Sequence, residues 1–317
     1  MSGKQPDEVV RHIFKVFSKT THQCMEPNET CTKPAIQSHS IPNSNVLSRL
    51  SRDGHVVAPK VKISLHSPPE VMLNPVGKNK ATTFTGLCSD HDNDIFRPID
   101  IVVPDIENSM HLFLLAYRAV FREHHAVIQS AIRIQSTYSK RVESGVDPAD
   151  ESSDFGLLAS SHLCNAYETY TYKRRFDVMY QKLNWTGLKH RIVVLDCQVP
   201  TVAVSSMFSM DNIDSDEVPR ICLSVIPREG DVVVIFSCVP EDEFAMVDRI
   251  DRIMSSTGYY QKYLISKLIL ANCDNFVLSP DYFDALTEDR KEAIRLLCAR
   301  MDIFNSDDYE DENLYLF

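Results

Sequence analysis

The sequence lacks a long hydrophobic run. Nowhere in its 317 residues is there a stretch of about 18 consecutive apolar residues, the length that a membrane-spanning helix needs. The N-terminus (MSGKQPDEVVRHIFKVF) mixes acidic and basic residues and has no extended apolar core, unlike a secretory signal peptide. We therefore expect a cytoplasmic protein without a membrane partner.

Glycine is also scarce. The chain has nine glycines and none of them are clustered, which leaves little room for a phosphate-binding glycine loop. The Gly-x-Ser-x-Gly motif of the α/β-hydrolases does not occur either. These absences argue against nucleotide-dependent and serine-hydrolase chemistry.

The chain has no surplus of positive charge. Its formal net charge is −11, which argues against a protein that coats nucleic acid by bulk electrostatics. The distribution is uneven, because residues 1–104 carry 12 Lys and Arg against 10 Asp and Glu, while the remainder carries 21 against 34. If one part of the chain meets a phosphate backbone, we expect it to be the N-terminal part.

Changes in pattern along the chain predict an α+β protein of three segments. Residues 1–104 are rich in Pro, Asn, Ser and His and are predicted to form a small metal-supported domain. Its expected elements are a helix over 7–18, strands over 35–41 and 55–65, and a short helix that begins near residue 89. No internal repeat is visible.

Helical periodicity dominates residues 105–190, predicted as a connector of two long helices over 106–142 and 154–183. Residues 191–317 are predicted to be an α+β domain of unknown role. Its consecutive strands with short turns indicate an antiparallel sheet, followed by helices. The predicted strands span 191–199, 201–208, 220–227 and 231–239, and the predicted helices 243–255, 258–271 and 286–301.

In the connector, two groups of residues that could bind nucleic acid or metal are expected to have structural roles instead. In YETYTYKRRFDVMY, we expect Tyr167, Tyr170 and Phe176 to lie in the core and residues 173–175 to form a solvated basic face. His124 and His125 are expected to pack between helices or face solvent, and not to bind metal.

Most of the nine cysteines stand singly within apolar stretches and are expected to be buried thiols. Cys24, Cys31 and Cys88 differ, because their surroundings are polar and contain histidine. Zinc prefers four tetrahedral Cys or His ligands, which often come as two pairs. Cys24-x6-Cys31 and Cys88-x2-His91 supply such pairs, so we predict structural zinc. Unconnected thiols on a loop are the alternative, and His39 is a further candidate ligand.

At this point the N-terminal third resembles a known family. A cysteine pair precedes a strand that ends in SHSIP, a second strand follows, and LCSDHD opens a helix. This order is similar to that of the HNH, or His-Me finger (ββα-metal), nucleases. The resemblance implies a zinc-supported, treble-clef-like ββα finger that hydrolyses phosphodiester bonds in DNA or RNA.

By this resemblance, His39 lies at the position of the general base and Asp92 at the position that binds a catalytic Mg²⁺ or Mn²⁺. Cys24, Cys31, Cys88 and His91 lie at the positions of the zinc ligands. The residue before the base is Ser38, where the family usually has Asp, Glu or His. A general base and a buried structural histidine are both open interpretations of His39.

Two functional hypotheses follow. The first is a metal-dependent endonuclease, controlled by the C-terminal region, for which a toxic or antiviral-defence effector is a plausible setting. The second is a non-catalytic, zinc-stabilised binding module that recruits a protein or nucleic-acid partner. In both cases the acidic C-terminal domain is a candidate surface for a regulatory protein, and a homo-oligomer is compatible with the sequence.

Overall fold

The computed structural model describes residues 12, 23–62, 70–210, 218–247, 249–299 and 313–317. The chain divides into two compact units, each built from separated stretches of sequence. The first unit comprises Met1–Ser38, Phe84–Asp92 and Val120–Leu183, and the second comprises His39–Thr83, Asn93–Ala119 and Asn184–Phe317. The predicted helix over 7–18 lies outside the described residues except for His12, which is helical.

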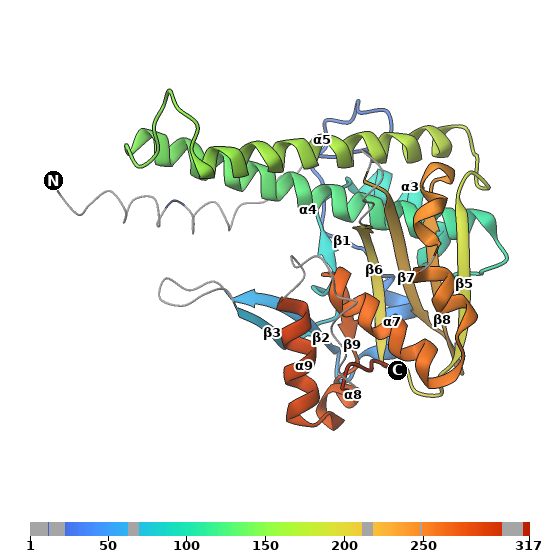
Figure 1. Cartoon of the computed structure of the whole chain (residues 1–317). Helices are drawn as coiled ribbons and strands as arrows, with labels where there is room; N and C mark the ends of the chain where they lie inside the picture. The colour runs from blue at the N-terminus through green and yellow to red at the C-terminus, as the bar shows by residue number, and fades with distance from the viewer. Residues whose placement is uncertain (1–11, 13–22, 63–69, 211–217, 248, 300–312) are drawn as a thin grey trace. The chain divides into compact units, whose positions relative to one another are not determined.

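The second unit contains a seven-stranded antiparallel sheet, counted over the described residues, in the order β3-β2-β9-β6-β7-β8-β5. Figure 1 shows β6, β7, β8 and β5 side by side in this unit. The predicted C-terminal antiparallel sheet is therefore present. Its strands are β2 (His55–Lys62), β3 (Glu70–Gly77), β5 (Lys189–Asp196), β6 (Val202–Ser209), β7 (Arg220–Pro227), β8 (Asp231–Cys238) and β9 (Phe276–Leu278).

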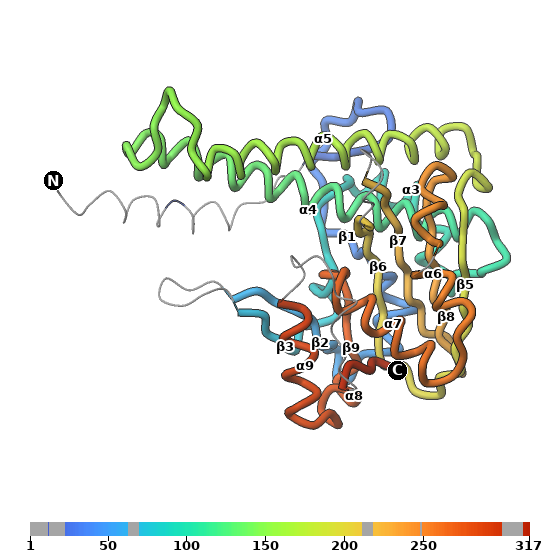
Figure 2. The backbone as a smooth tube through the Cα atoms, in the orientation of Figure 1, coloured from blue at the N-terminus to red at the C-terminus, as the bar shows by residue number. Residues whose placement is uncertain are grey.

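The core of this unit lies between one face of the sheet and the C-terminal helices. Alternate residues of β7 and β8, such as Leu223 and Val234, share one hydrophobic cluster with Ile253, Ile269 and the last helix. The tube in Figure 2 shows this part of the chain. The helical elements here are η2 (Pro240–Met246), α6 (Arg249–Ser255), α7 (Gly258–Asn272), α8 (Pro280–Ala285) and α9 (Glu288–Ala299).

The central strands are buried on both faces, since every residue of β7 is buried. This explains why their sequences read as apolar runs instead of alternating patterns. Two short helical segments, η1 (Asn43–Leu47) and α2 (Ser48–Leu50), precede β2. Among the described residues, no helix combines the length and the apolar composition required to cross a membrane.

Several elements of this unit differ from the sequence prediction, including η1 and α2, which were not predicted. β3 lies where a loop was expected, and β9 and α8 were not predicted. Pro75 breaks the strand pattern of β3, but β3 is an edge strand, where a missing N–H donor is tolerated. β2 pairs with β3 and β9, which places strands from the N-terminal third in the main sheet.

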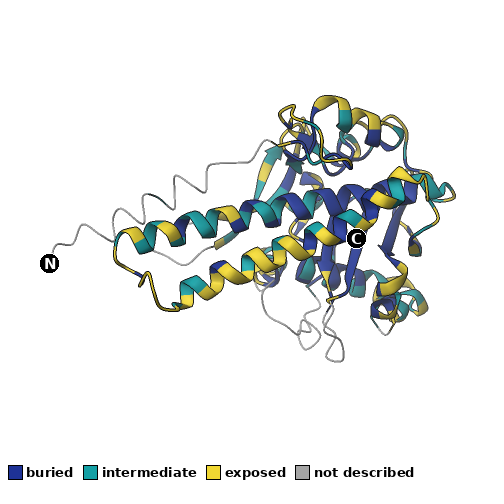
Figure 3. Cartoon of the chain, turned by 90° about the horizontal axis from the view of Figure 1, so that it is seen from above, coloured by how far each residue is buried: buried dark blue, intermediate teal, exposed yellow. Residues whose placement is uncertain are grey.

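In the first unit, α4 (Ser109–Glu143) from Val120 onward packs antiparallel to α5 (Asp154–Gln181). His124 Nδ1 lies 3.1 Å from Thr169 Oγ1, and Gln135 Nε2 donates to the carbonyl oxygen of Ala159 at 2.9 Å. Figure 3 shows the exposed outer side of α5. The predicted pair of long helices is therefore present. His124 and His125 are both buried; His124 packs against α5, and His125 Nε2 lies 2.9 Å from Thr85 Oγ1.

Two expectations about α5 are wrong. Lys173, predicted on a solvated face, is 1% exposed, and Tyr167, predicted in the core, is 68% exposed. The buried face runs instead through Ala159, Thr169 and Tyr172 to Phe176 and Asp177. Lys173 tolerates burial because Asp177, one turn later, supplies the opposite charge.

Two short strands and a helix lie where the ββα finger is expected. β1 (Ser38–His39) and β4 (Thr83–Phe84) form a two-stranded sheet, and α3 (Ser89–Asp100) follows. The strand partner of β1 is therefore β4 and not β2, which belongs to the main sheet. The boundary between the units falls within β1, within β4, within α3 and within α4.

Candidate metal centre

Four predicted ligands of the first unit lie together. One donor atom from each of Cys24, Cys31, Cys88 and His91 lies within 4.8 Å of all the others. Cys24 and Cys88 are buried, while Cys31 and His91 are half-buried. Among the described residues this is the group that could hold a metal ion, and its chemistry suits one such as zinc.

The spacing of the donor atoms agrees with a tetrahedral centre. With Zn–S near 2.3 Å and Zn–N near 2.0 Å, tetrahedral angles place two sulfurs about 3.8 Å apart and sulfur and nitrogen about 3.5 Å apart. Cys31 Sγ and Cys88 Sγ are 3.8 Å apart. His91 Nδ1 lies 3.5 Å from Cys24 Sγ and 3.3 Å from Cys88 Sγ. These three separations match a tetrahedral zinc centre, and the remaining ones are at most 4.8 Å.

The loop between the first two ligands is organised by Glu26, which is 1% exposed. Its carboxylate accepts the backbone N–H groups of Asn28 at 2.6 Å, Thr30 at 2.6 Å and Cys31 at 3.2 Å. The N–H of Glu29 closes a turn onto the carbonyl oxygen of Glu26 at 3.0 Å. Because Glu26 binds the N–H of Cys31, it positions a ligand through the backbone.

Backbone hydrogen bonds join the two ligand pairs. Met25 N–H donates to the carbonyl oxygen of Gly86, and Ile36 N–H donates to that of Leu87, at 2.9 and 2.8 Å. Gly86 packs closely against the ring of Phe84. A Cβ atom at residue 86 would lie 2.5 Å from a ring carbon, which is too close for an ordinary contact. The chain then starts α3, and its first turn carries His91 next to Cys88.

The thiols differ in acidity. Burial raises the pKa of Cys24 to about 12, against the opposing effect of the Cys88 N–H, which donates to Cys24 Sγ at 3.3 Å. Burial also raises the pKa of Cys88, but hydrogen bonds, the largest from the backbone N–H of His91, outweigh it and the net pKa is lowered. A coordinating cation deprotonates such thiols, and N–H donors stabilise the thiolate.

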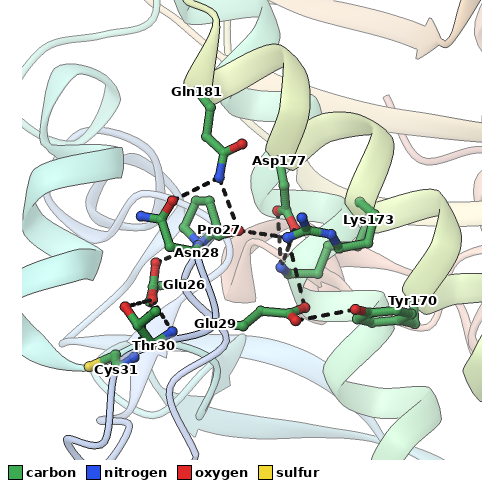
Figure 4. A network of polar contacts seen from close by, with 11 residues as sticks. Glu26, Pro27, Asn28, Glu29, Thr30, Cys31, Tyr170, Lys173, Asp177 and Gln181 are labelled. Carbon is green, nitrogen blue, oxygen red and sulfur yellow. Dashed lines mark hydrogen bonds and ion pairs between the residues drawn. The ribbon is translucent and has the colours of Figure 1, made fainter.

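Side chains of α5 hold the loop from outside (Figure 4). Arg174 Nη1 donates to the carbonyl oxygen of Pro27 at 2.6 Å, and Gln181 Nε2 donates to the same oxygen at 3.2 Å. Gln181 Nε2 also donates to Asn28 Oδ1 at 2.9 Å. Tyr170 donates its hydroxyl proton to Glu29 Oε2 at 3.2 Å. The turn between Cys24 and Cys31 is therefore docked on α5.

The two predicted catalytic residues fall in different units. His39, in the second unit, is half-buried, and its Nε2 lies 3.0 Å from the carbonyl oxygen of Lys78. Asp92, in the first unit, is half-buried and follows the ligand His91 in the first turn of α3. Ser38, the predicted departure from the family pattern, is buried.

The sequence did not point to three residues that shape the loop: Glu26, Arg174 and Gln181. Pro27 with Asn28 was a signal for the turn, because Pro favours its second position. Nothing in the sequence identified the two side chains of α5, which lie about 150 residues from the loop they bind.

A scan against protein-family models and searches of curated proteins and of solved structures each found no match to this chain. The comparisons therefore add no family. The resemblance to HNH nucleases stays a hypothesis.

Proposed function

We propose that Cys24, Cys31, Cys88 and His91 hold a structural zinc ion and that the chain is a non-catalytic, zinc-stabilised binding module. The closed donor set carries the assignment of structural zinc, and the acidic charge of the remaining chain favours a binding module over a nuclease. Structural zinc sites fill all four tetrahedral positions with protein ligands, whereas catalytic ones leave a position for water or substrate. Three thiols and one imidazole at tetrahedral spacing leave no such position.

The charge distribution supports a protein partner over nucleic acid. Residues 105–317 carry 21 Lys and Arg against 34 Asp and Glu, and such a surface repels phosphate while attracting a basic protein surface. Under this proposal the metal fixes the N-terminal loops, and the acidic remainder of the chain recruits the partner.

The metal-dependent nuclease is the second candidate, favoured by the order of elements: a strand that ends at His39, a partner strand, and a helix that carries Asp92. In a neutral imidazole, the contact with the Lys78 carbonyl oxygen requires the proton on Nε2, so Nδ1 is the nitrogen that can accept a proton. His39 would then activate water, and Asp92 would hold Mg²⁺ or Mn²⁺. The defence setting belongs to this candidate.

One experiment separates the two candidates. Purified protein, with its zinc content measured, is incubated with plasmid DNA and with RNA in Mg²⁺ or Mn²⁺. It is compared with His39→Ala and Asp92→Ala, and with two matched controls, His55→Ala and Asp94→Ala, which replace exposed residues of the same types.

The binding module predicts about one zinc per chain and equal background cleavage in all five proteins. Cleavage by the wild type that His39→Ala and Asp92→Ala abolish, while both controls keep it, would establish the nuclease instead. A wild-type protein without zinc after expression in zinc-supplemented medium would contradict the metal centre itself.

A further inference from the structure

The turn over residues 27–29 lies between the ligands Cys24 and Cys31. It is held by hydrogen bonds both toward the metal cluster and toward α5. Toward the cluster, the Glu26 carboxylate connects the turn to the backbone N–H of Cys31. Toward α5, Arg174 and Gln181 donate to the carbonyl oxygen of Pro27. A displacement of α5 from the turn would therefore displace the ligand Cys31, and a displacement of Cys31 would disturb the contact of the turn with α5.

Arg174 is itself held in place by a buried ion pair. Its Nη1 donates to Asp177 Oδ2 at 2.9 Å, and Lys173 Nζ lies 3.0 Å from each carboxylate oxygen of Asp177. Lys173 also lies over the ring of Phe121 at 4.7 Å. Lys173 and Asp177 are both almost fully buried, so their geometry is fixed by packing. The guanidinium of Arg174 is thus aimed at the turn by contacts that involve none of the four metal ligands.

We propose that Arg174 and Gln181 are positioning residues of the metal site. By docking the turn on α5 they keep Cys24 and Cys31 close enough to share one metal ion, and metal binding in turn further stabilises the C-terminal half of α5. This inference rests on the proposed structural zinc. The coupling works in both directions, because two linked binding equilibria change each other's constants by the same factor.

The expected loss of zinc affinity follows from what is known of residues that orient metal ligands. Outer residues that orient metal ligands typically change metal affinity about 10- to 100-fold when they are mutated. Arg174 and Gln181 contact the turn and not a ligand itself. We therefore expect each variant to bind zinc about tenfold more weakly, at the lower end of this range.

The test uses the full chain and zinc(II), with affinity measured by competition against a chromophoric chelator. Arg174→Gln removes the charged donor, and Gln181→Glu replaces the donating amide by an acceptor of the same shape. Arg175→Gln is the matched control, since Arg175 is the exposed neighbour on the same helix. Hydrogen exchange of residues 170–181 is followed with and without zinc.

The inference predicts about tenfold weaker zinc binding in Arg174→Gln and Gln181→Glu and wild-type affinity in Arg175→Gln. It also predicts that zinc slows exchange of residues 170–181 in the wild type and less in the two variants. Arg174→Lys, which keeps a donor, should recover part of the affinity. Equal affinity in all variants, or zinc-independent exchange, would overturn the inference while the zinc site stands. A wild type that binds no zinc would overturn the proposed function first.

Discussion

At the scale of single residues, Cys88 connects the metal cluster. Its sulfur lies 3.8 Å from Cys31 Sγ and 3.3 Å from His91 Nδ1, and its N–H donates to Cys24 Sγ. The ligand set could be predicted from the sequence because polar, histidine-containing surroundings distinguished these cysteines from the buried ones. The burial of Lys173 could not, because it depends on a contact with Phe121 that lies far away in sequence.

The first prediction concerns Cys88. We expect Cys88→Ser to lose the zinc, because a neutral hydroxyl replaces a thiolate that lies beside the ligand atoms of Cys31 and His91. Cys164→Ser is the control, since Cys164 is exposed and does not belong to the cluster. Metal analysis by mass spectrometry and thermal unfolding measure the result. A Cys88→Ser protein that kept its zinc and its melting temperature would disprove the ligand assignment.

The second prediction concerns pH. Burial, together with the charge of Lys173, lowers the pKa of His124 from 6.5 to about 3. A histidine whose pKa is lower in the folded state contributes its full stability above the unfolded value. That stability is lost as the pH falls from about 6.5 toward 3, by up to about 1.4 kcal/mol per pH unit.

Urea unfolding at pH 7 and pH 5 measures this effect. His124→Gln, which can still donate to Thr169 Oγ1, should lose less stability between the two pH values than the wild type. Burial lowers the pKa of His190 to about 4 as well, so a residual acid sensitivity should remain. An unchanged difference between pH 7 and pH 5 in His124→Gln would show that His124 does not titrate on unfolding.

At the scale of elements, the helices and the β5–β8 strands follow from local pattern, and their contacts do not. In α5, Tyr167 was expected in the core and is 68% exposed, whereas Lys173 was expected on a solvated face and is buried. The actual face is polar in part, because Thr169 binds His124 and Asp177 binds Lys173. Hydrophobic periodicity detects only the apolar members of such a face.

The third prediction tests the ion pair of α5. Asp177→Ala leaves Lys173 buried without its carboxylate partner and should lower the free energy of unfolding by about 3–5 kcal/mol. The double variant Lys173→Met, Asp177→Leu removes both charges and should recover most of this loss. Urea unfolding measures all three proteins. If the double variant were no more stable than Asp177→Ala, burial of an unpaired charge would not be the cause.

At the scale of the whole molecule, the sequence predicted an α+β protein with an antiparallel sheet, and that class is present. Which strands join the sheet was not predictable. β2 pairs with β9 across more than 200 residues of sequence, and β9 is only three residues long. The three consecutive domains remain a prediction. Because residues 1–104 contribute to both units, a metal held by the cluster in the first unit would stabilise only part of what this segment builds.

The central claim is a structural zinc ion with three sulfur ligands and one nitrogen ligand. X-ray absorption at the zinc edge of the purified protein measures these ligands directly. The account predicts three Zn–S distances of about 2.3 Å and one Zn–N distance of about 2.0 Å, with no oxygen ligand. A first shell that contains water or carboxylate oxygen, or fewer than three sulfurs, would contradict it.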